Sequence, residues 1–390
     1  MSLKASLWLG WRSLVHHRTR SLLLLLATTL IALLPLVVSR LFTAVEAKAQ
    51  ARAESTPIVL GRKGSRFDLV LGALWFRGRT PEALQLKELD RVRTDGLAEP
   101  VPMLARNTAL GQPLVGTTPD YFARRGLRFA SGDLPVGLGE CVVGADLAAM
   151  HKISVGDAIL SDRRNPLAID EGYPLRMHVV GVLARAGTAD DGAIFASLET
   201  LWVVEGIGHG HGEAEEQPAA RVMRREGDKV VLDSGVVQYQ EVTPQNLASF
   251  HFHTEADQLP LTAVLVFPRD AKASAMLLAR YRVLDDVQAI EPRAVVDELT
   301  GYVLGLKRFL DVQTAMVTAS TLLLLLLIVM LTLRLRSREI ETLGRIGAPS
   351  SVLWGAFGFE FGSVILAGFA LAAVLAVAGV ALLQETLPWL

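Results

Sequence analysis

The sequence predicts a membrane protein with three α-helical spans and one large extracytoplasmic α+β domain between the first and the second span. Three observations predict this architecture. Uncharged aliphatic runs occur at three places, lysine and arginine gather beside them, and a polar segment of mixed composition separates the first run from the second. The chain of 390 residues is 51% hydrophobic but only 6% aromatic, so the apolar excess is aliphatic.

Three apolar runs are long enough to cross a bilayer as helices. They cover residues 21–39, 312–333 and 361–383. A helix needs roughly 20 apolar residues to cross about 30 Å of hydrocarbon, and apolar runs of about 18 or more are rare in soluble proteins. The first run also exceeds the apolar part of a signal peptide, which has about 7–15 residues. We therefore predict transmembrane helices at 21–43, 312–333 and 352–384.

Positive charges beside the spans set the predicted orientation. The leader 1–20, read as an amphipathic helix, has four lysines and arginines and no acid, and the segment 334–351 has four arginines. Because lysine and arginine accumulate in short cytoplasmic loops, both segments are predicted in the cytoplasm. The domain 44–311 and the tail 385–390 are then predicted outside.

The segment 44–311 has the pattern of a folded domain rather than the composition of a disordered chain. Short β-branched runs bounded by Gly, Asp or Pro predict strands, and helical periodicity separates them. The strands are predicted at 140–143, 177–183 and 262–267, and the helices at about 82–93, 144–152 and 272–281. This mixture predicts an α+β fold with two lobes. The stretch from about 205 to 257, rich in glycine, charge and histidine, is interpreted as an insertion between them.

A long helix is predicted to link the outer domain to the second span. Pro292 suits the first turn of a helix, and glycine is the only helix breaker that follows before the second span ends. A helix over residues 293–333 would be about 60 Å long at 1.5 Å per residue. We expect it to run into the membrane as one stiff element.

The sequence lacks the common motifs of nucleotide-binding and hydrolytic enzymes. It contains no Gly-x-x-x-x-Gly-Lys-Ser/Thr, no Gly-x-Ser-x-Gly, no His-Glu-x-x-His and no Cys-x-x-Cys. The net charge of −1 gives no overall field for nucleic acid. Cys141 is the single cysteine and is expected to be a small buried apolar residue. The chain is predicted not to be an enzyme and not to bind nucleic acid.

Three segments follow one another in an order that resembles a known family. They are the N-terminal run 9–21, the stretch 132–157 with its Gly-Glu-Cys-Val-Val-Gly sequence, and the arginine-rich segment 336–348. Together they resemble FtsX/MacB-like ABC permeases, which have an amphipathic N-terminal helix, a MacB-type periplasmic core domain and a cytoplasmic coupling segment. These permeases normally have four spans, whereas three are predicted here.

The resemblance implies the permease subunit of an ABC transporter, a homodimer that works with a separate ATP-binding cassette ATPase. ATP would act only through that partner. The resemblance also implies a multi-pass protein of the inner membrane, in contact with lipid, with its large domain in the periplasm. Its expected function is to transmit ATP-driven motion to that domain and so export or extract a substrate. Two alternatives remain open: a signalling subunit that activates an envelope enzyme, and an ATPase-independent membrane metal sensor.

Candidate coupling residues lie in the segment 334–351. Ile340, Leu343 and Ile346 recur at i, i+3 and i+6, which would place an apolar stripe on one helix face. The alternative is a simple positive-inside anchor, but an anchor needs no interleaved acids. The residues expected to contact the ATPase are Arg338, Glu339, Ile340, Leu343 and Ile346.

Glu360 is the only charged residue between Val352 and Leu383. An acid inside the membrane is costly and marks a functional position by default. The resembling family often has an acid where the third span opens. Because the uncharged stretch around Glu360 exceeds one crossing, we favour a position at the membrane interface.

Four of the eight histidines form two His-x-His pairs, each followed by acids. They are His209, His211, His251 and His253. In a strand, residues i and i+2 share a face, so each pair can present two imidazoles together. Imidazole suits zinc, and the lack of nearby cysteine or methionine pairs argues against monovalent copper. These histidines predict a zinc site that weakens as the pH falls toward about 6. The alternative is a solvated loop without metal.

Overall fold

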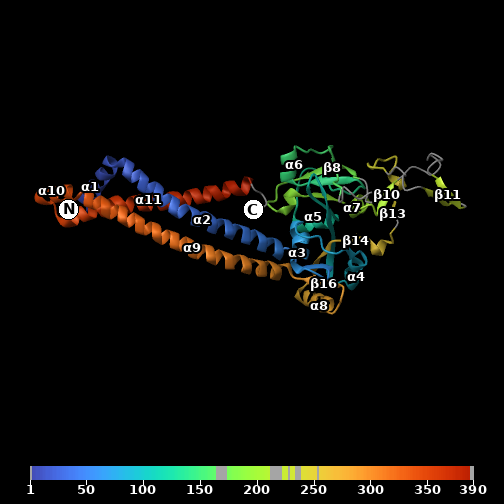
Figure 1. Cartoon of the computed structure of the whole chain (residues 1–390). Coiled ribbons are helices and arrows are strands. Elements are labelled where there is room, and N and C mark those ends of the chain that lie inside the picture. Colours follow the sequence, from blue (N-terminus) through green and yellow to red (C-terminus); the bar gives the residue numbers. More distant parts are fainter. Residues whose placement is uncertain are drawn as a thin grey trace. The chain divides into compact units, whose positions relative to one another are not determined.

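The computed structural model describes residues 2–163, 174–210, 222–226, 229–232, 239–252 and 254–386. The chain divides into two compact units. One is formed mainly by Met1–Ala47 and Leu299–Pro388, and the other by Lys48–Glu298. The first is helical, and the second, which we call the outer unit, contains the strands (Figure 1).

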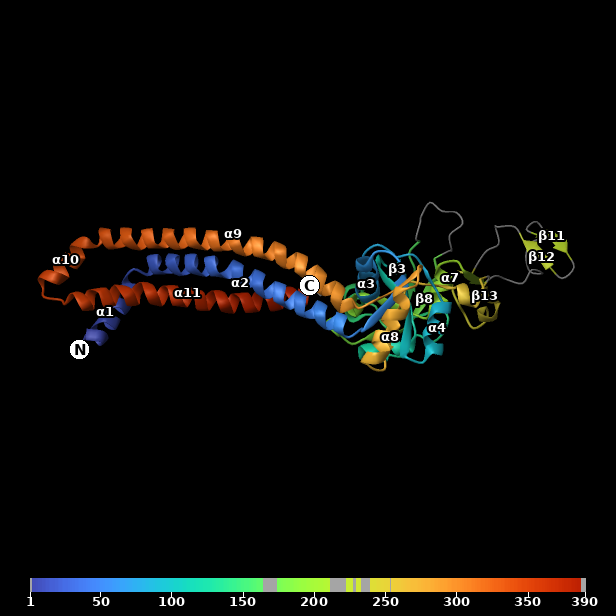
Figure 2. The ribbon, with the colours of Figure 1, turned by 90° about the horizontal axis from the view of Figure 1, so that it is seen from below.

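Five helices build the helical unit. They are α1 (Ser2–His16), α2 (Arg18–Glu54), α9 (Pro292–Leu335), α10 (Ser337–Arg345) and α11 (Ser350–Thr386), with α2 and α9 continuing into the outer unit. Figures 1 and 2 show α2, α9 and α11 running beside one another within this unit, and α1 packs against α11.

Three of these helices are long and apolar enough to cross a membrane. The apolar segments are Arg18–Glu54, Asp311–Leu335 and Ser350–Leu383. Apolar side chains of α9 such as Leu323 and Met330 are more than half exposed, as expected of a helix surface that faces lipid. The predicted long helix after Pro292 is confirmed, since α9 runs unbroken from Pro292 to Leu335.

The outer unit is built on one ten-stranded sheet. Its strand order is β16-β1-β15-β3-β4-β9-β6-β8-β5, with β7 paired to β8. The strands are β1 (Ile58–Arg62), β3 (Ala98–Ala109), β4 (Gln112–Thr117), β5 (Phe129–Gly132), β6 (Glu140–Val143), β7 (Ala158–Leu160), β8 (Arg176–Leu183), β9 (Ile194–Ala196), β15 (Ala263–Pro268) and β16 (Val287–Ile290). Two pairs are parallel, β4 with β9 and β6 with β8. The expected two-lobe division is wrong, because strands from both halves share this sheet and one core.

Short helices accompany the sheet. They are α3 (Arg66–Trp75), α4 (Lys87–Asp95), α5 (Pro119–Arg125), α6 (Ala145–His151), α7 (Leu198–Val204) and α8 (Ala271–Arg282), with the 3-10 turns η1 (Ala189–Gly192), η3 (Leu247–Ser249) and η4 (Ala256–Gln258). Three small two-stranded sheets lie apart from the large one. They pair β2 (Leu84–Gln85) with β14 (Pro260–Leu261), β10 (Gly208–Gly210) with β13 (Phe250–Phe252), and β11 (Val222–Glu226) with β12 (Lys229–Leu232).

The core of the outer unit is aliphatic and follows the central strands. Ile58, Leu60, Leu114 and Ile194 are fully buried in it. Cys141, on β6, is also fully buried, which confirms the prediction of a small apolar core residue. Burial, assisted by the charge of Glu140, raises the pKa of the Cys141 thiol to about 12.

Candidate functional site

A buried carboxylate joins four segments of the helical unit. The Glu360 side chain on α11 is only 2% exposed. Arg20 of α2 donates through Nη2 to Oε1 of Glu360, and Ser13 of α1 donates through Oγ to Oε2 at 2.7 Å. Arg336, between α9 and α10, approaches Oε2 with Nη1 at 3.4 Å and donates to Ser13 Oγ at 3.1 Å. We call these four residues the Glu360 cluster.

Aromatic rings next to Glu360 hold the two guanidinium groups. Arg20 lies over the Phe361 ring at 5.6 Å, and Arg336 lies over the Phe357 ring at 5.3 Å. A guanidinium is attracted to the face of such a ring, more strongly where water is excluded. The segment of α11 around Glu360 thus binds each arginine through both a carboxylate oxygen and a π face.

The charges of this cluster tie several helix segments to one carboxylate. An unpaired carboxylate away from water costs several kcal/mol, roughly, and its two arginines offset that cost. Because the arginines come from α2 and from the α9–α10 junction, neither segment can shift against α11 without breaking an ion pair. The interfacial position of Glu360 stays a prediction.

Sequence reasoning singled out Glu360 but missed its partners. A signal was present, because the third predicted span, 352–384, has one acid while arginines stand at the ends of the first two apolar runs. Charge counting alone could not tell which arginine pairs with Glu360, since four arginines lie near the ends of the first two apolar runs. They are Arg18, Arg20, Arg334 and Arg336. The packing of α1 and α2 against α11 selects Arg20 and adds Ser13.

The predicted coupling residues lie on or next to α10. Arg338, Glu339, Ile340 and Leu343 are on the helix, and Ile346 is the residue that follows its last turn. Ile340 and Leu343 are half-buried, whereas Ile346 is 78% exposed. Their role in coupling stays a prediction.

A second buried ion pair lies in the outer unit. Arg52, in the last turn of α2, donates to both carboxylate oxygens of Asp190 in η1, at 2.6 and 2.9 Å. Tyr121 and Thr188 also donate to Asp190, through hydroxyls at 2.5 and 2.7 Å. The Nε of Arg52 donates to the Leu74 carbonyl. We call Arg52, Asp190, Tyr121 and Thr188 the Asp190 cluster.

The pKa shifts in the Asp190 cluster keep the ion pair charged. Burial favours the neutral form of Asp190, but the Arg52 guanidinium and three donated hydrogen bonds together hold the Asp190 pKa below its usual range. Burial alone would lower the Arg52 pKa, but Tyr121 and Asp190 raise it above its ordinary value. Burial and the Asp190 charge also raise the Tyr121 pKa, so the phenol stays a donor at neutral pH.

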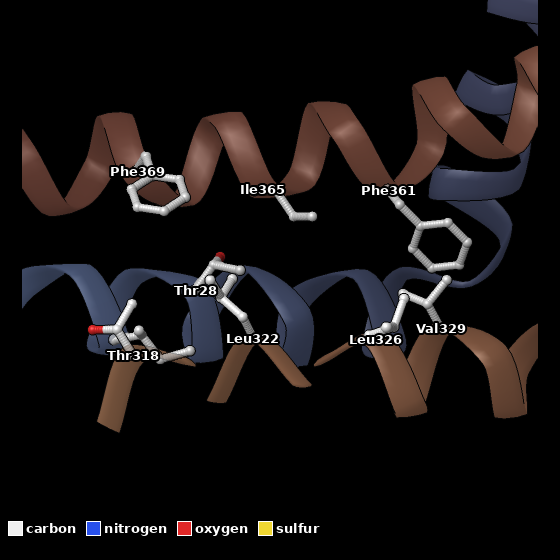
Figure 3. Close-up of a pocket in the computed structure, with 9 residues that line it drawn as sticks. Thr28, Thr318, Leu322, Leu326, Val329, Phe361, Ile365 and Phe369 are labelled. Atoms are coloured by element: carbon white, nitrogen blue, oxygen red, sulfur yellow. The ribbon is translucent and has the colours of Figure 1, made fainter. Parts of the chain in front are cut away.

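An apolar cleft lies in the helical unit between α2, α9 and α11 (Figure 3). Its volume is about 290 Å³. The residues around it are Thr28, Ile31, Thr318, Leu322, Leu326, Val329, Phe361, Ile365 and Phe369. The Thr28 hydroxyl donates to the Leu24 carbonyl of its own helix at 2.9 Å. The residues that line the cleft carry no charged group, so the cleft suits an apolar group rather than a charged solute.

The structure brings together one histidine from each predicted pair. His209 on β10 lies directly opposite His251 on β13, and their ring centroids are 5.0 Å apart. His211 and His253 lie outside the described residues. Among the described residues no group of three or more His, Cys, Asp or Glu could hold a metal ion, so the zinc site stays a prediction.

Comparison with known proteins identifies a family and similar solved structures. Residues 30–242, more than half of the chain, match the model of the MacB-like periplasmic core domain. The chain is similar to the periplasmic region of MacB from Actinobacillus actinomycetemcomitans, with 10% identity, 63% of this chain and 94% of that chain covered, and a TM-score of 0.35. It is also similar to the extracellular domain of the noncanonic ABC-type transporter YknZ from Gram-positive bacteria, with 12% identity, coverage of 60% and 98%, and a TM-score of 0.33. No curated protein matches the chain.

Proposed function

Because the chain belongs to the MacB-like periplasmic core domain family, we propose that it is the permease subunit of an ABC transporter of the FtsX/MacB type. In this proposal a separate ATPase supplies the energy, and the outer α+β domain uses it to export or extract a substrate. The observation that carries the proposal is the Glu360 cluster. It joins the start of α10, the predicted ATPase contact, to α1, α2 and α11 through one carboxylate.

The route of the motion follows from the helices themselves. A push on α10 reaches Arg336, the residue directly before this helix, and Arg336 contacts Glu360. Glu360 also binds Arg20, at the start of α2, so α2 and α11 respond together. Helix α2 is continuous to Glu54, and its last turn carries Arg52 of the Asp190 cluster. In this proposal the motion follows the chain of α2 from Arg20 to Arg52.

We further propose the topology that the arginines favour. The leader 1–20 and the coupling segment 334–351 lie in the cytoplasm, the spans are 21–43, 312–333 and 352–384, and the domain 44–311 lies in the periplasm. The protein is then a multi-pass subunit of the inner membrane; the homodimer is proposed only from the resemblance to FtsX/MacB-like permeases. Three apolar helices and the distribution of arginine support this proposal.

Thiol labelling of intact cells tests the topology. Glu199→Cys and Thr342→Cys each place a thiol at an exposed position, the first in the outer unit and the second on α10. A membrane-impermeant maleimide is expected to label Glu199→Cys and to label Thr342→Cys only after the cells are opened. Labelling of Thr342→Cys in intact cells would contradict the proposed topology.

Substitutions on α10 test the contact with the ATPase. Leu343→Asp places a charge in the apolar stripe and is expected to abolish co-purification of the ATPase while membrane insertion persists. Thr342→Asp is the matched control, because it adds the same charge at the neighbouring exposed position. Equal co-purification and equal ATP hydrolysis in the two variants would show that this stripe does not bind the ATPase.

A further inference from the structure

The two small strands β10 and β13 place two histidines directly opposite each other. His209 is the register partner of His251, and both side chains are half-buried. Directly opposed residues in an antiparallel pair have Cβ atoms about 4.5–5.5 Å apart, within reach of one bound ion. The two imidazole rings are inclined at 65°.

Packing on the opposite face fixes this register. Phe252 lies against Gly208 and Phe250 lies against Gly210, so closely that a Cβ atom on either glycine would come within 2.6 or 2.7 Å of a ring carbon. The Phe252 ring also packs edge-on against Trp202, with centroids 6.1 Å apart. Because side chains alternate along a strand, both histidines point to the other face. A slip by one residue would remove the phenylalanines from their glycines, so the histidine pair is held in place.

A hydrogen bond sets the tautomer of one histidine. His251 Nδ1 lies 2.9 Å from the Ser249 carbonyl oxygen, which can only accept, so Nδ1 carries the hydrogen and donates it. In the neutral ring the lone pair then resides on Nε2. Histidines that bind metals usually donate their other ring N–H to a carbonyl or carboxylate in this way.

The spacing of the rings fits a shared metal ion. With Zn–N bonds of about 2.0–2.1 Å and a tetrahedral angle, the centroids of two bound imidazoles lie roughly 5 Å apart. The observed separation is 5.0 Å. Two neutral imidazoles suit a divalent ion of intermediate softness, which favours zinc over magnesium or calcium.

We propose that His209 and His251 form a two-histidine binding site for a divalent transition-metal ion, with zinc as the expected ion and water completing its coordination. The ion would join β10 to β13. This site goes beyond the proposed transport function, since it uses neither the spans nor the ATPase.

Zinc titration of the full chain tests the site. The protein is purified in detergent without a polyhistidine tag, and zinc affinity is measured by calorimetry and by competition with a zinc indicator dye. His209→Ala and His251→Ala are each expected to lose affinity by about tenfold or more, because even loss of a ligand's hydrogen-bonding partner costs roughly 10- to 100-fold. His151→Ala is the matched control, since His151 is exposed at the end of α6 and far along the chain from the pair.

Two further measurements keep the test decisive. Far-UV circular dichroism of each metal-free variant verifies folding, and His209→Gln replaces His209→Ala if the alanine variant unfolds. Divalent copper is then used as a spectroscopic substitute, and electron paramagnetic resonance is expected to show nitrogen couplings that disappear with either substitution. Unchanged zinc affinity in both variants, or an equal loss in His151→Ala, would overturn the proposal. Either result leaves the proposed ATPase coupling unaffected, because zinc binding is read without ATP.

Discussion

The Asp190 cluster and the Glu360 cluster both stabilise a buried carboxylate, but they differ in the number of arginines that bind it. Each buries a carboxylate almost completely, with 1% of Asp190 and 2% of Glu360 exposed, and each pairs it with an arginine of α2. Asp190 receives hydrogen bonds on both oxygens from one arginine, Arg52, whose side chain is 6% exposed. Glu360 is instead shared by two arginines that are 23% and 17% exposed.

This difference in the number and exposure of the arginines indicates which cluster is fixed and which can rearrange. A bidentate pair with both members enclosed has one low-energy geometry, and removing either member leaves a buried charge. A carboxylate that is shared by two partly exposed arginines can lose its contact with one of them and keep its contact with the other. We therefore interpret the Asp190 cluster as a permanent joint of the outer unit and the Glu360 cluster as a contact that can lose one arginine and keep the other.

The largest expected effect is on the Asp190 cluster. Asp190→Asn leaves the Arg52 charge buried without its counterion, and is expected to lower the free energy of unfolding of the outer unit by about 3–5 kcal/mol. Denaturant unfolding of the full chain in detergent, followed by tryptophan fluorescence, measures it. Glu298→Gln is the control, because its partner Arg66 is exposed and such pairs contribute about 1 kcal/mol or less. Equal losses in the two variants would contradict a permanent joint.

The second effect tests whether one arginine still stabilises a buried carboxylate when the other has been removed. Glu360→Gln removes the charge that both arginines share and is expected to cost about 1–3 kcal/mol, whereas Arg20→Gln or Arg336→Gln alone costs less. At the other cluster, Arg52→Gln is expected to cost as much as Asp190→Asn, since no second arginine donates to that carboxylate among its described hydrogen bonds. Thermal unfolding of all five variants gives the ranking. If Arg20→Gln alone lowers the stability as much as Glu360→Gln does, the two arginines do not share the stabilisation of this carboxylate.

The third effect is a pH dependence of the Asp190 cluster. Because the folded pKa of Asp190 lies below its unfolded value of about 3.9, the unfolded chain binds the proton first. The contribution of the pair is then complete above about pH 5 and is lost as the pH falls through the folded pKa, by at most about 1.4 kcal/mol per pH unit. The stability gap between the native chain and Asp190→Asn, measured at pH 7, 5, 4 and 3, is expected to shrink only below about pH 5. A gap that stays constant would show that Asp190 titrates normally.

The smallest effect is expected at an exposed pair. Arg345 donates to Glu341 at 2.7 Å one turn apart on α10, with both side chains open to solvent. Glu341→Gln is expected to change stability by about 0.5 kcal/mol or less. Thermal unfolding in detergent is the measurement, and a loss as large as that of Glu360→Gln would remove the distinction between buried and exposed charge.

The helices and strands that the sequence predicted correctly are those that depend on a local pattern of residues. Apolar runs located the three long helices, and Pro292 located the start of α9. Short β-branched runs located β6, β8 and β15, and the resemblance at 132–157 is confirmed by the family match over 30–242. The helix expected at 82–93 begins only at Lys87, because Leu84 and Gln85 pair with β14. Such a shift depends on residues far away in the chain.

The parts that sequence missed are contacts between distant segments. Arg52 and Asp190 are 138 positions apart, and Arg20 and Glu360 are 340 positions apart. No periodicity or spacing connects such residues, since only the packed fold brings them together. The single sheet was missed for the same reason: β15 pairs with β3, with Ala263 opposite Met103, which joins halves that look separate along the chain. His209 and His251 likewise meet only through the register of β10 and β13.

The burial of Cys141 has a practical consequence for following this protein at work. Its thiol is enclosed in β6 and its raised pKa of about 12 keeps it protonated, while alkylating reagents attack the thiolate. The folded chain therefore behaves as if it were free of cysteine, and a fluorophore or spin label on an introduced surface thiol reports from one position. Once the sheet opens, Cys141 becomes the only native thiol that reacts. Its rate of alkylation is then a direct measure of how often the outer unit unfolds, without any substitution in the chain.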